Sequence, residues 1–63
     1  MHYLMQFFTY GHLRKDLQPI SATFHTLAAT LDETLPENPE KTTALRKLLE
    51  AKDCAVRARL FEP

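Results

Sequence analysis

The chain has little of what usually holds so small a domain together. Its 63 residues include a single cysteine, which excludes an internal disulfide. That cysteine and the three histidines (His2, His12 and His25) show no zinc-binding spacing, so we expect neither a metal site nor a cofactor. A chain of this length buries only about 60% of its unfolded surface. Oligomerisation is the stabilising device that remains, and we expect a homo-oligomer.

Long apolar runs, net charge and catalytic groupings are also missing. The apolar start over residues 3–10 is too short for a signal-peptide core, and no stretch could span a bilayer, so we expect a cytoplasmic protein without a membrane partner. Eight basic and eight acidic residues cancel. This balance argues against long nucleic acids, because affinity for them scales with the phosphates neutralised. No Ser/His/Asp or Cys/His arrangement is evident, so we do not expect an enzyme.

The strongest helical signal lies in residues 39–60. Within it, residues 44–58 contain no glycine, proline or serine and consist almost entirely of good helix formers. Two apolar stripes run along this segment. One is aliphatic and is interrupted by Lys52, and the other consists mainly of small residues: Leu45, Leu49, Val56 and Leu60; Ala44, Leu48, Ala51, Ala55 and Ala58. Two adjacent stripes predict two partners, one within the chain and one in a neighbouring chain.

Residues 16–34 predict the partner helix within the chain. Asp16 is a favoured N-cap, and Pro19 falls in the first turn, where its missing N–H costs little. Apolar residues then recur at steps of three and four, as on one face of a helix: Leu17, Ile20, Phe24, Leu27, Leu31 and Leu35.

A short connection joins the two predicted helices. Pro36 pushes Leu35 out of the helical conformation, and Asn38 followed by Pro39 restarts a helix as N-cap and first residue. Such a connection makes the helices antiparallel neighbours. The expected fold is therefore all-α, an antiparallel two-helix hairpin over residues 16–60 preceded by an N-terminal arm over residues 1–15.

The arm is rich in aromatic residues between positions 2 and 10 and ends at Gly11, the only glycine. An extended segment and a short helix both fit this stretch. We expect Phe7 and Phe8 to plug a hydrophobic seam rather than to contact a ligand.

Folding the hairpin at residue 37 separates the charges. The end at the connection becomes acidic, with only Lys41 opposing four carboxylates: Asp32, Glu33, Glu37 and Glu40. The open end becomes basic and lies beside Tyr10: His12, Arg14, Lys15, Arg57 and Arg59. Basic side chains suit phosphate and an aromatic ring suits a nucleobase, which predicts a small phosphate-bearing ligand. The alternative is a solvated charged face, on which helical ion pairs contribute only about 0.2–0.5 kcal/mol each.

The run from Pro36 to Ala51, PENPEKTTALRKLLEA, followed by Ala55 and Ala58, resembles a phage domain family. It is similar to the helical hairpin of the viral anti-CBASS and anti-Thoeris cyclic nucleotide sponges. Leu27-Ala28 and the arm sequence Thr9-Tyr10 followed by His12 match as well, so the likeness covers about residues 9 to 60.

The resemblance implies a compact oligomer, notably a hexamer, that sequesters cyclic di- or trinucleotides without cleaving them. Such a protein silences bacterial anti-phage immunity and, if phage-encoded, acts in the host cytoplasm. By the resemblance, Tyr10 stacks on a base, and His25 stands where the family has a phosphate-binding basic residue. Family positions that commonly hold Trp, Asn and a closing Arg are occupied by Cys54, Val56 and Phe61. Arg57 or Arg59 is the candidate replacement for that closing arginine.

Together the charge pattern and the resemblance predict a set of ligand-binding residues with no catalytic and no metal-binding member: Tyr10, His12, Arg14, His25, Arg57 and Arg59. The expected function is non-catalytic sequestration of cyclic oligonucleotides. A structural or protein-interaction hairpin without a small ligand is the alternative, and it explains both stripes of the second helix equally well.

Overall fold

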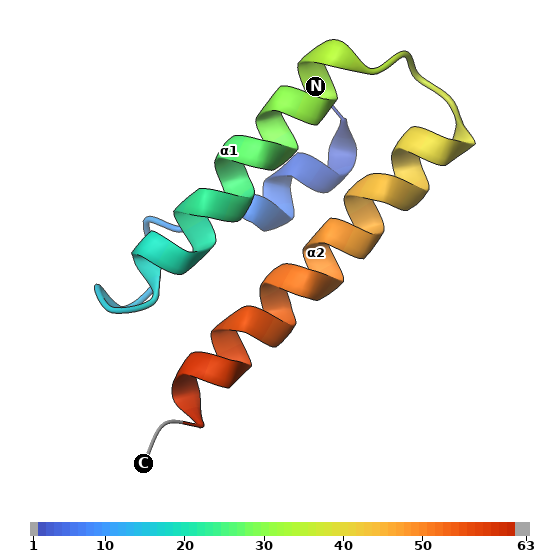
Figure 1. Cartoon of the computed structure of the whole chain (residues 1–63). Helices are drawn as coiled ribbons and strands as arrows, with labels where there is room; N and C mark the ends of the chain where they lie inside the picture. Colours follow the sequence, from blue (N-terminus) through green and yellow to red (C-terminus); the bar gives the residue numbers. More distant parts are fainter. Residues whose placement is uncertain (1, 62–63) are drawn as a thin grey trace.

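The computed structural model describes residues 2–61, and over this range the chain folds into helices alone. A 3-10 helix, η1 (Tyr3–Phe8), precedes two long α-helices, α1 (Gln18–Thr34) and α2 (Pro39–Leu60). The long helices run antiparallel and η1 packs against both on one face of the pair, within an elongated body of 41 × 18 × 15 Å (Figure 1). The predicted all-α helical hairpin is confirmed, and the arm takes the helical one of its two expected conformations.

The connection between α1 and α2 follows the local chemistry of its residues. Leu35 is extended, with φ −95° and ψ 141°, as the following proline requires. The Asn38 side chain caps α2 by accepting a 2.8 Å hydrogen bond from the backbone N–H of Lys41. The predicted end of α1 and the predicted start of α2 are therefore confirmed, and α2 ends at Leu60 as expected.

The start of α1 was predicted wrongly. The helix begins at Gln18, with Leu17 as its N-cap residue and no side-chain cap, rather than at an Asp16 cap. The Asp16 carboxylate instead accepts two hydrogen bonds from the Arg14 guanidinium, of 3.0 and 2.8 Å. The amides of Leu17 and Gln18 both donate to the Arg14 carbonyl, so a turn precedes the helix. The carboxylate has a cationic partner two residues upstream and is not used as a cap.

The η1 helix completes the hydrophobic core. Leu4 and Met5 are buried and Phe8 is fully buried, and all three pack with Ala28 of α1 and Leu45 of α2. The expectation that Phe8 plugs a seam is confirmed. Phe7, by contrast, is about half exposed.

Because η1 covers part of α1, the buried stripe of α1 differs from the predicted one. Leu17 is buried as expected, but the fully buried positions are Ser21 and Ala28, while Leu27 is 47% exposed. The spacing of apolar residues in α1 predicts a contact with one helix, α2. The second contact, with η1, buries Ala28, which lies beside the aliphatic stripe.

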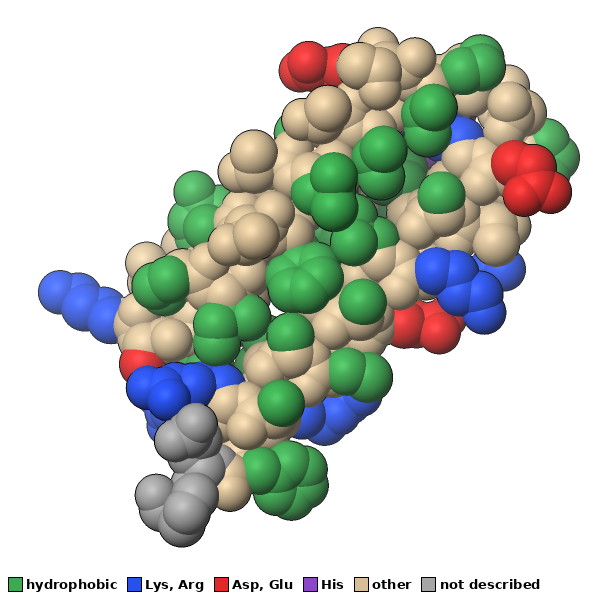
Figure 2. All heavy atoms as spheres, in the orientation of Figure 1, with side chains coloured by type: hydrophobic (Ala, Val, Ile, Leu, Met, Phe, Trp, Pro, Cys, Tyr) green, Lys and Arg blue, Asp and Glu red, His purple; other side chains and the backbone are tan. Residues whose placement is uncertain are grey.

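The opposite face of the hairpin has no helix over it within residues 2–61. His25 and Asp32 of α1 line the same hollow as Met5 of η1, so they mark the side of α1 that faces η1. The apolar residues on the opposite side of α1, which recur every three or four positions, face away from η1. On α2 the small-residue stripe lies on this same side, and Figure 2 shows apolar side chains lining the groove between the helices. Helical spacing assigns seven residues to this region, which we call the uncovered face: Phe24, Leu27, Leu31, Ala44, Leu48, Ala51 and Ala55. Three of them, Phe24, Leu31 and Leu48, are partly buried because they also pack against the core.

Candidate functional site

At the connection end, the acidic cluster is organised around one buried lysine. Lys41 is 3% exposed, and its ammonium contacts the carboxylates of Asp32 at 3.1 Å and Glu37 at 2.6 Å. The hydrogen bond to Glu37 raises the pKa of Lys41, and the hydrogen bond from Lys41 lowers the pKa of Asp32. Asp32 also accepts from the backbone N–H of His2 at 3.1 Å, which ties the start of the arm to the hairpin. These charges hold the fold together.

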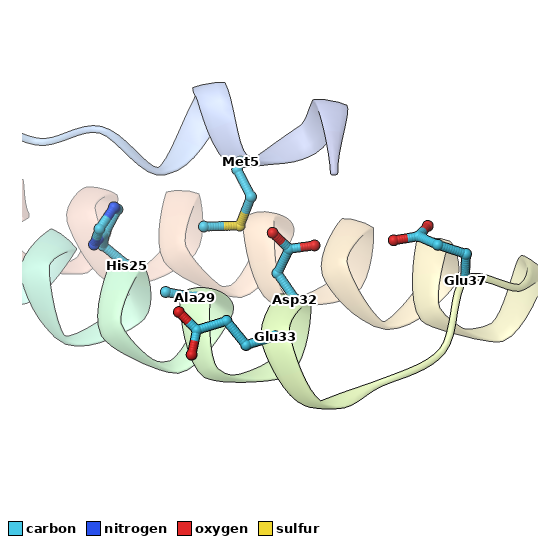
Figure 3. A pocket seen from close by; sticks show the side chains of 6 residues that line it. All are labelled: Met5, His25, Ala29, Asp32, Glu33 and Glu37. Atoms are coloured by element: carbon cyan, nitrogen blue, oxygen red, sulfur yellow. The ribbon is translucent and has the colours of Figure 1, made fainter. Parts of the chain in front are cut away.

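A hollow of about 500 Å³ opens beside this network. Figure 3 shows His25 at one end and Glu37 at the other, with the side chains of Met5, Asp32 and Glu33 between them. The Tyr10 ring meets the His25 ring edge-on, with 5.5 Å between centroids and 68° between planes. The structure thus brings two predicted ligand residues together, but the hollow that His25 lines also carries three carboxylates, those of Asp32, Glu33 and Glu37.

At the open end, the basic residues are exposed. The Arg14 side chain is 64% exposed in its ion pair with Asp16. The hydrogen bond from Arg14 lowers the pKa of Asp16, and the charge of Arg59 lowers it further, so both guanidinium groups lie near one carboxylate. His12 and Lys15 are exposed in the same turn region. Figure 2 shows blue side chains at this end, and further ones along α2 toward the connection.

A pocket of about 200 Å³ lies at the open end, between the first turn of α1 and the last turns of α2. It is lined by residues of both helices and of the preceding loop: Leu13, Ser21, Lys52, Asp53, Val56 and Arg57. Lys52 and Arg57 against Asp53 leave one net positive charge on its wall. Arg57 donates to the Cys54 Sγ at 3.3 Å. A shallower hollow of about 160 Å³ follows at the tip, against Arg57, Leu60 and Phe61.

Lys52 links this pocket to the core. Its ammonium donates to the Phe7 carbonyl at 2.6 Å, lies 3.8 Å from the Asp53 carboxylate and stands 5.8 Å from the centre of the Phe8 ring. The aliphatic stripe of α2 is interrupted here because the lysine stem packs inward while its ammonium reaches the arm.

The predicted ligand residues therefore fall into three groups. Tyr10 and His25 are in contact near the acidic hollow, Arg14 and Arg59 flank Asp16, and Arg57 lines the open-end pocket. His12 is exposed in the turn that follows Tyr10.

Sequence reasoning missed Ser21 and Lys52 as pocket residues. Each leaves a signal in the pattern: Lys52 interrupts an apolar stripe, and Ser21 lies four residues after the buried Leu17 and seven before the buried Ala28.

Comparison of the chain with protein-family models, with curated proteins and with solved structures finds no match. Within residues 2–61, no group of three or more His, Cys, Asp and Glu side chains is arranged to hold a metal ion. None of the helices in that range is long and apolar enough to cross a membrane. The fold and charges define a helical hairpin with one end closed by a buried ion network and one end that presents basic side chains.

Proposed function

We propose that this chain is a non-catalytic binding protein that self-associates and sequesters cyclic di- or trinucleotides at its open end. In this proposal it counters bacterial anti-phage immunity, as the sequence resemblance implies. The observation that carries the proposal is the surplus of cations at the open end, where, within residues 2–61, five basic residues outnumber two carboxylates: Arg14, Lys15, Lys52, Arg57 and Arg59, against Asp16 and Asp53. Guanidinium and ammonium groups are the donors that phosphate oxygens prefer.

Pocket size supports self-association. Sites for small organic ligands usually measure about 300–1,000 Å³, whereas the open-end pocket of one chain measures about 200 Å³. A whole cyclic dinucleotide would therefore need walls from more than one chain. The uncovered face offers a contact for a second copy, because it leaves Leu27 47% exposed beside a row of alanines. The resemblance sets the expected number of copies at six.

Calorimetric titration with a panel of cyclic di- and trinucleotides tests the ligand class. We expect saturable heat and a rise in melting temperature with at least one member of the panel. Base–aromatic stacking contributes about 1–3 kcal/mol per base, so Tyr10→Ala should weaken binding about 5-fold or more. Tyr3→Ala is the matched control, because Tyr3 is exposed on η1 and its ring stacks on the neighbouring His2 ring, away from the open end.

No heat and no thermal shift across the whole panel would exclude this function. Unchanged binding by Tyr10→Ala would remove the stacking role alone. The proposal of a non-catalytic role is tested by denaturing the complex with heat and analysing the released ligand. Intact cyclic nucleotide is expected, and linear products would show hydrolysis.

A protein-interaction hairpin without a small ligand is the second candidate, and the uncovered face favours it. An apolar groove flanked by helices suits an amphipathic helix of another protein. A stoichiometric complex with one protein partner, and no heat of binding with any cyclic nucleotide of the panel, would favour this candidate over the first.

A further inference from the structure

The Ser21 hydroxyl has no place in the hydrogen-bonding scheme of the fold. Ser21 is fully buried, and its Oγ is the one buried side-chain polar atom in residues 2–61 without a hydrogen-bond partner. Buried hydroxyl groups in folded proteins are nearly always paired. An alanine at this position would fit the same space without leaving a polar group unpaired. The hydroxyl therefore needs an explanation outside the packing of the core.

The same serine lines the open-end pocket, together with two cations that keep donors to spare. An ammonium carries three N–H donors and a guanidinium five. Lys52 directs one donor to the Phe7 carbonyl, and Arg57 directs one to the Cys54 sulfur, which is a weak acceptor. Ser21, Lys52 and Arg57 line one small pocket, and their hydroxyl, ammonium and guanidinium groups are donors that suit an oxyanion.

We propose that this pocket binds a single phosphate-type oxyanion, with Ser21 Oγ, Lys52 Nζ and the Arg57 guanidinium as donors. The volume of about 200 Å³ admits one such group but no nucleoside attached to it within the same chain. Asp53 is the opposing charge, since its half-exposed carboxylate stands on the pocket wall 3.8 Å from the Lys52 ammonium. The inference deepens the proposed function by naming its phosphate subsite, and it rests on that function only for the identity of the larger ligand.

The test is a titration of the ¹⁵N-labelled full chain with inorganic phosphate, followed by amide chemical shifts and matched in ionic strength with sodium chloride. We expect saturable shifts at residues 13, 21 and 52–57 with phosphate and none with chloride. Because a hydrogen bond to a charged group is worth about 1.5–3 kcal/mol, Arg57→Gln should weaken phosphate binding about 10-fold or more. Arg46→Gln is the matched control, since it removes the same charge from an exposed position about 16 Å away along α2.

Ser21→Ala gives the sharpest result, because two measurements should move in opposite directions. Without phosphate, the variant should melt at a higher temperature than the natural chain, since it no longer buries an unpaired hydroxyl. With phosphate, it should bind several-fold more weakly. Asp53→Asn should bind phosphate more tightly than the natural chain, because it removes the opposing charge.

Three outcomes would overturn the proposal. Equal phosphate affinity in Ser21→Ala and the natural chain would show that the hydroxyl is satisfied by water alone. A lower melting temperature of phosphate-free Ser21→Ala would show that the hydroxyl is paired within the protein. Equal weakening by Arg46→Gln and Arg57→Gln would reduce the effect to general charge screening. Phosphate binding without any cyclic nucleotide binding would retain this site and exclude the proposed function.

Discussion

The two ends of the hairpin use their charges differently. At the connection end, Lys41 is almost wholly enclosed and meets two carboxylates and two main-chain carbonyls, those of Asp32 and Leu35. At the open end, Arg14 and Arg57 are exposed; Arg14 pairs with the exposed Asp16 carboxylate and Arg57 donates to the Cys54 thiol. A buried ion network of this kind fixes the geometry of a fold, whereas exposed ion pairs contribute little to stability and remain available to a ligand.

Replacing either of two leucines of α2 by alanine should give the largest difference in stability between the hairpin centre and its open end. Leu45 is fully buried under η1 and α1, while Leu60 is 51% exposed at the open end. We expect Leu45→Ala to lower the free energy of unfolding by about 2–5 kcal/mol. Leu60→Ala should change it by no more than about 0.5 kcal/mol. Urea denaturation followed by circular dichroism measures both, and equal losses would show that the core extends to the open end.

Replacing each of two inward-directed lysines should give the next largest contrast. Lys41→Met leaves the partly buried Asp32 carboxylate without its cation, so we expect a large fall in melting temperature. Lys52→Met removes a hydrogen bond to the Phe7 carbonyl near an exposed Asp53, so the fall should be smaller. Thermal denaturation of the two variants side by side measures the difference, and the reverse order would contradict the structural role given to Lys41.

A charge on the uncovered face should disrupt self-association without unfolding the chain. Ala51 is exposed on that face, so Ala51→Glu is tolerated by one subunit but would place an unpaired charge in a contact between copies. We expect Ala51→Glu to shift sedimentation toward a smaller species with unchanged helical content. Lys47→Glu is the control for a new carboxylate on an exposed site of the same helix. If the natural chain sediments as a single subunit throughout, the uncovered face serves another partner.

Lowering the pH should reveal a smaller difference between the two ends, in how much each carboxylate contributes to stability. The pKa of Asp32 is lowered in the folded state by Lys41, so its contribution is present above its unfolded value of about 3.9 and is lost as pH falls through the lower folded value. The stability difference between the natural chain and Asp32→Asn should therefore shrink below about pH 4. The pKa of Asp16 is lowered as well, mainly by Arg14, but solvent screens that exposed pair. Asp16→Asn should follow the natural curve closely in denaturation experiments from pH 7 to pH 2.

Residues whose behaviour is set by their immediate neighbours could be predicted from the sequence. Pro36, Asn38 and Pro39 determine the connection through backbone restriction and capping, so the end of α1 and the start of α2 were predicted correctly. The separation of charges also followed from chain position, once an antiparallel hairpin was assumed.

Features that depend on contacts distant in the sequence could not be predicted. The η1 helix is held by Asp32, thirty positions away, and by a contact of His2 Nε2 with the Thr42 hydroxyl at 3.0 Å. Its docking buries Ala28 of α1 in the core together with Leu4, Met5 and Phe8. Asp16 does not cap α1, because Arg14 competes for its carboxylate. The N-cap preference of aspartate alone takes no account of such a neighbour.

Amide chemical-shift mapping with the cyclic nucleotide that binds best in the calorimetric panel tests the division between the ends most directly. The account predicts saturable shifts at residues 10–16 and 52–61 and no significant shifts in the Lys41 network over residues 32–41. Shifts confined to residues 32–41, or none with any nucleotide of the panel, would contradict it.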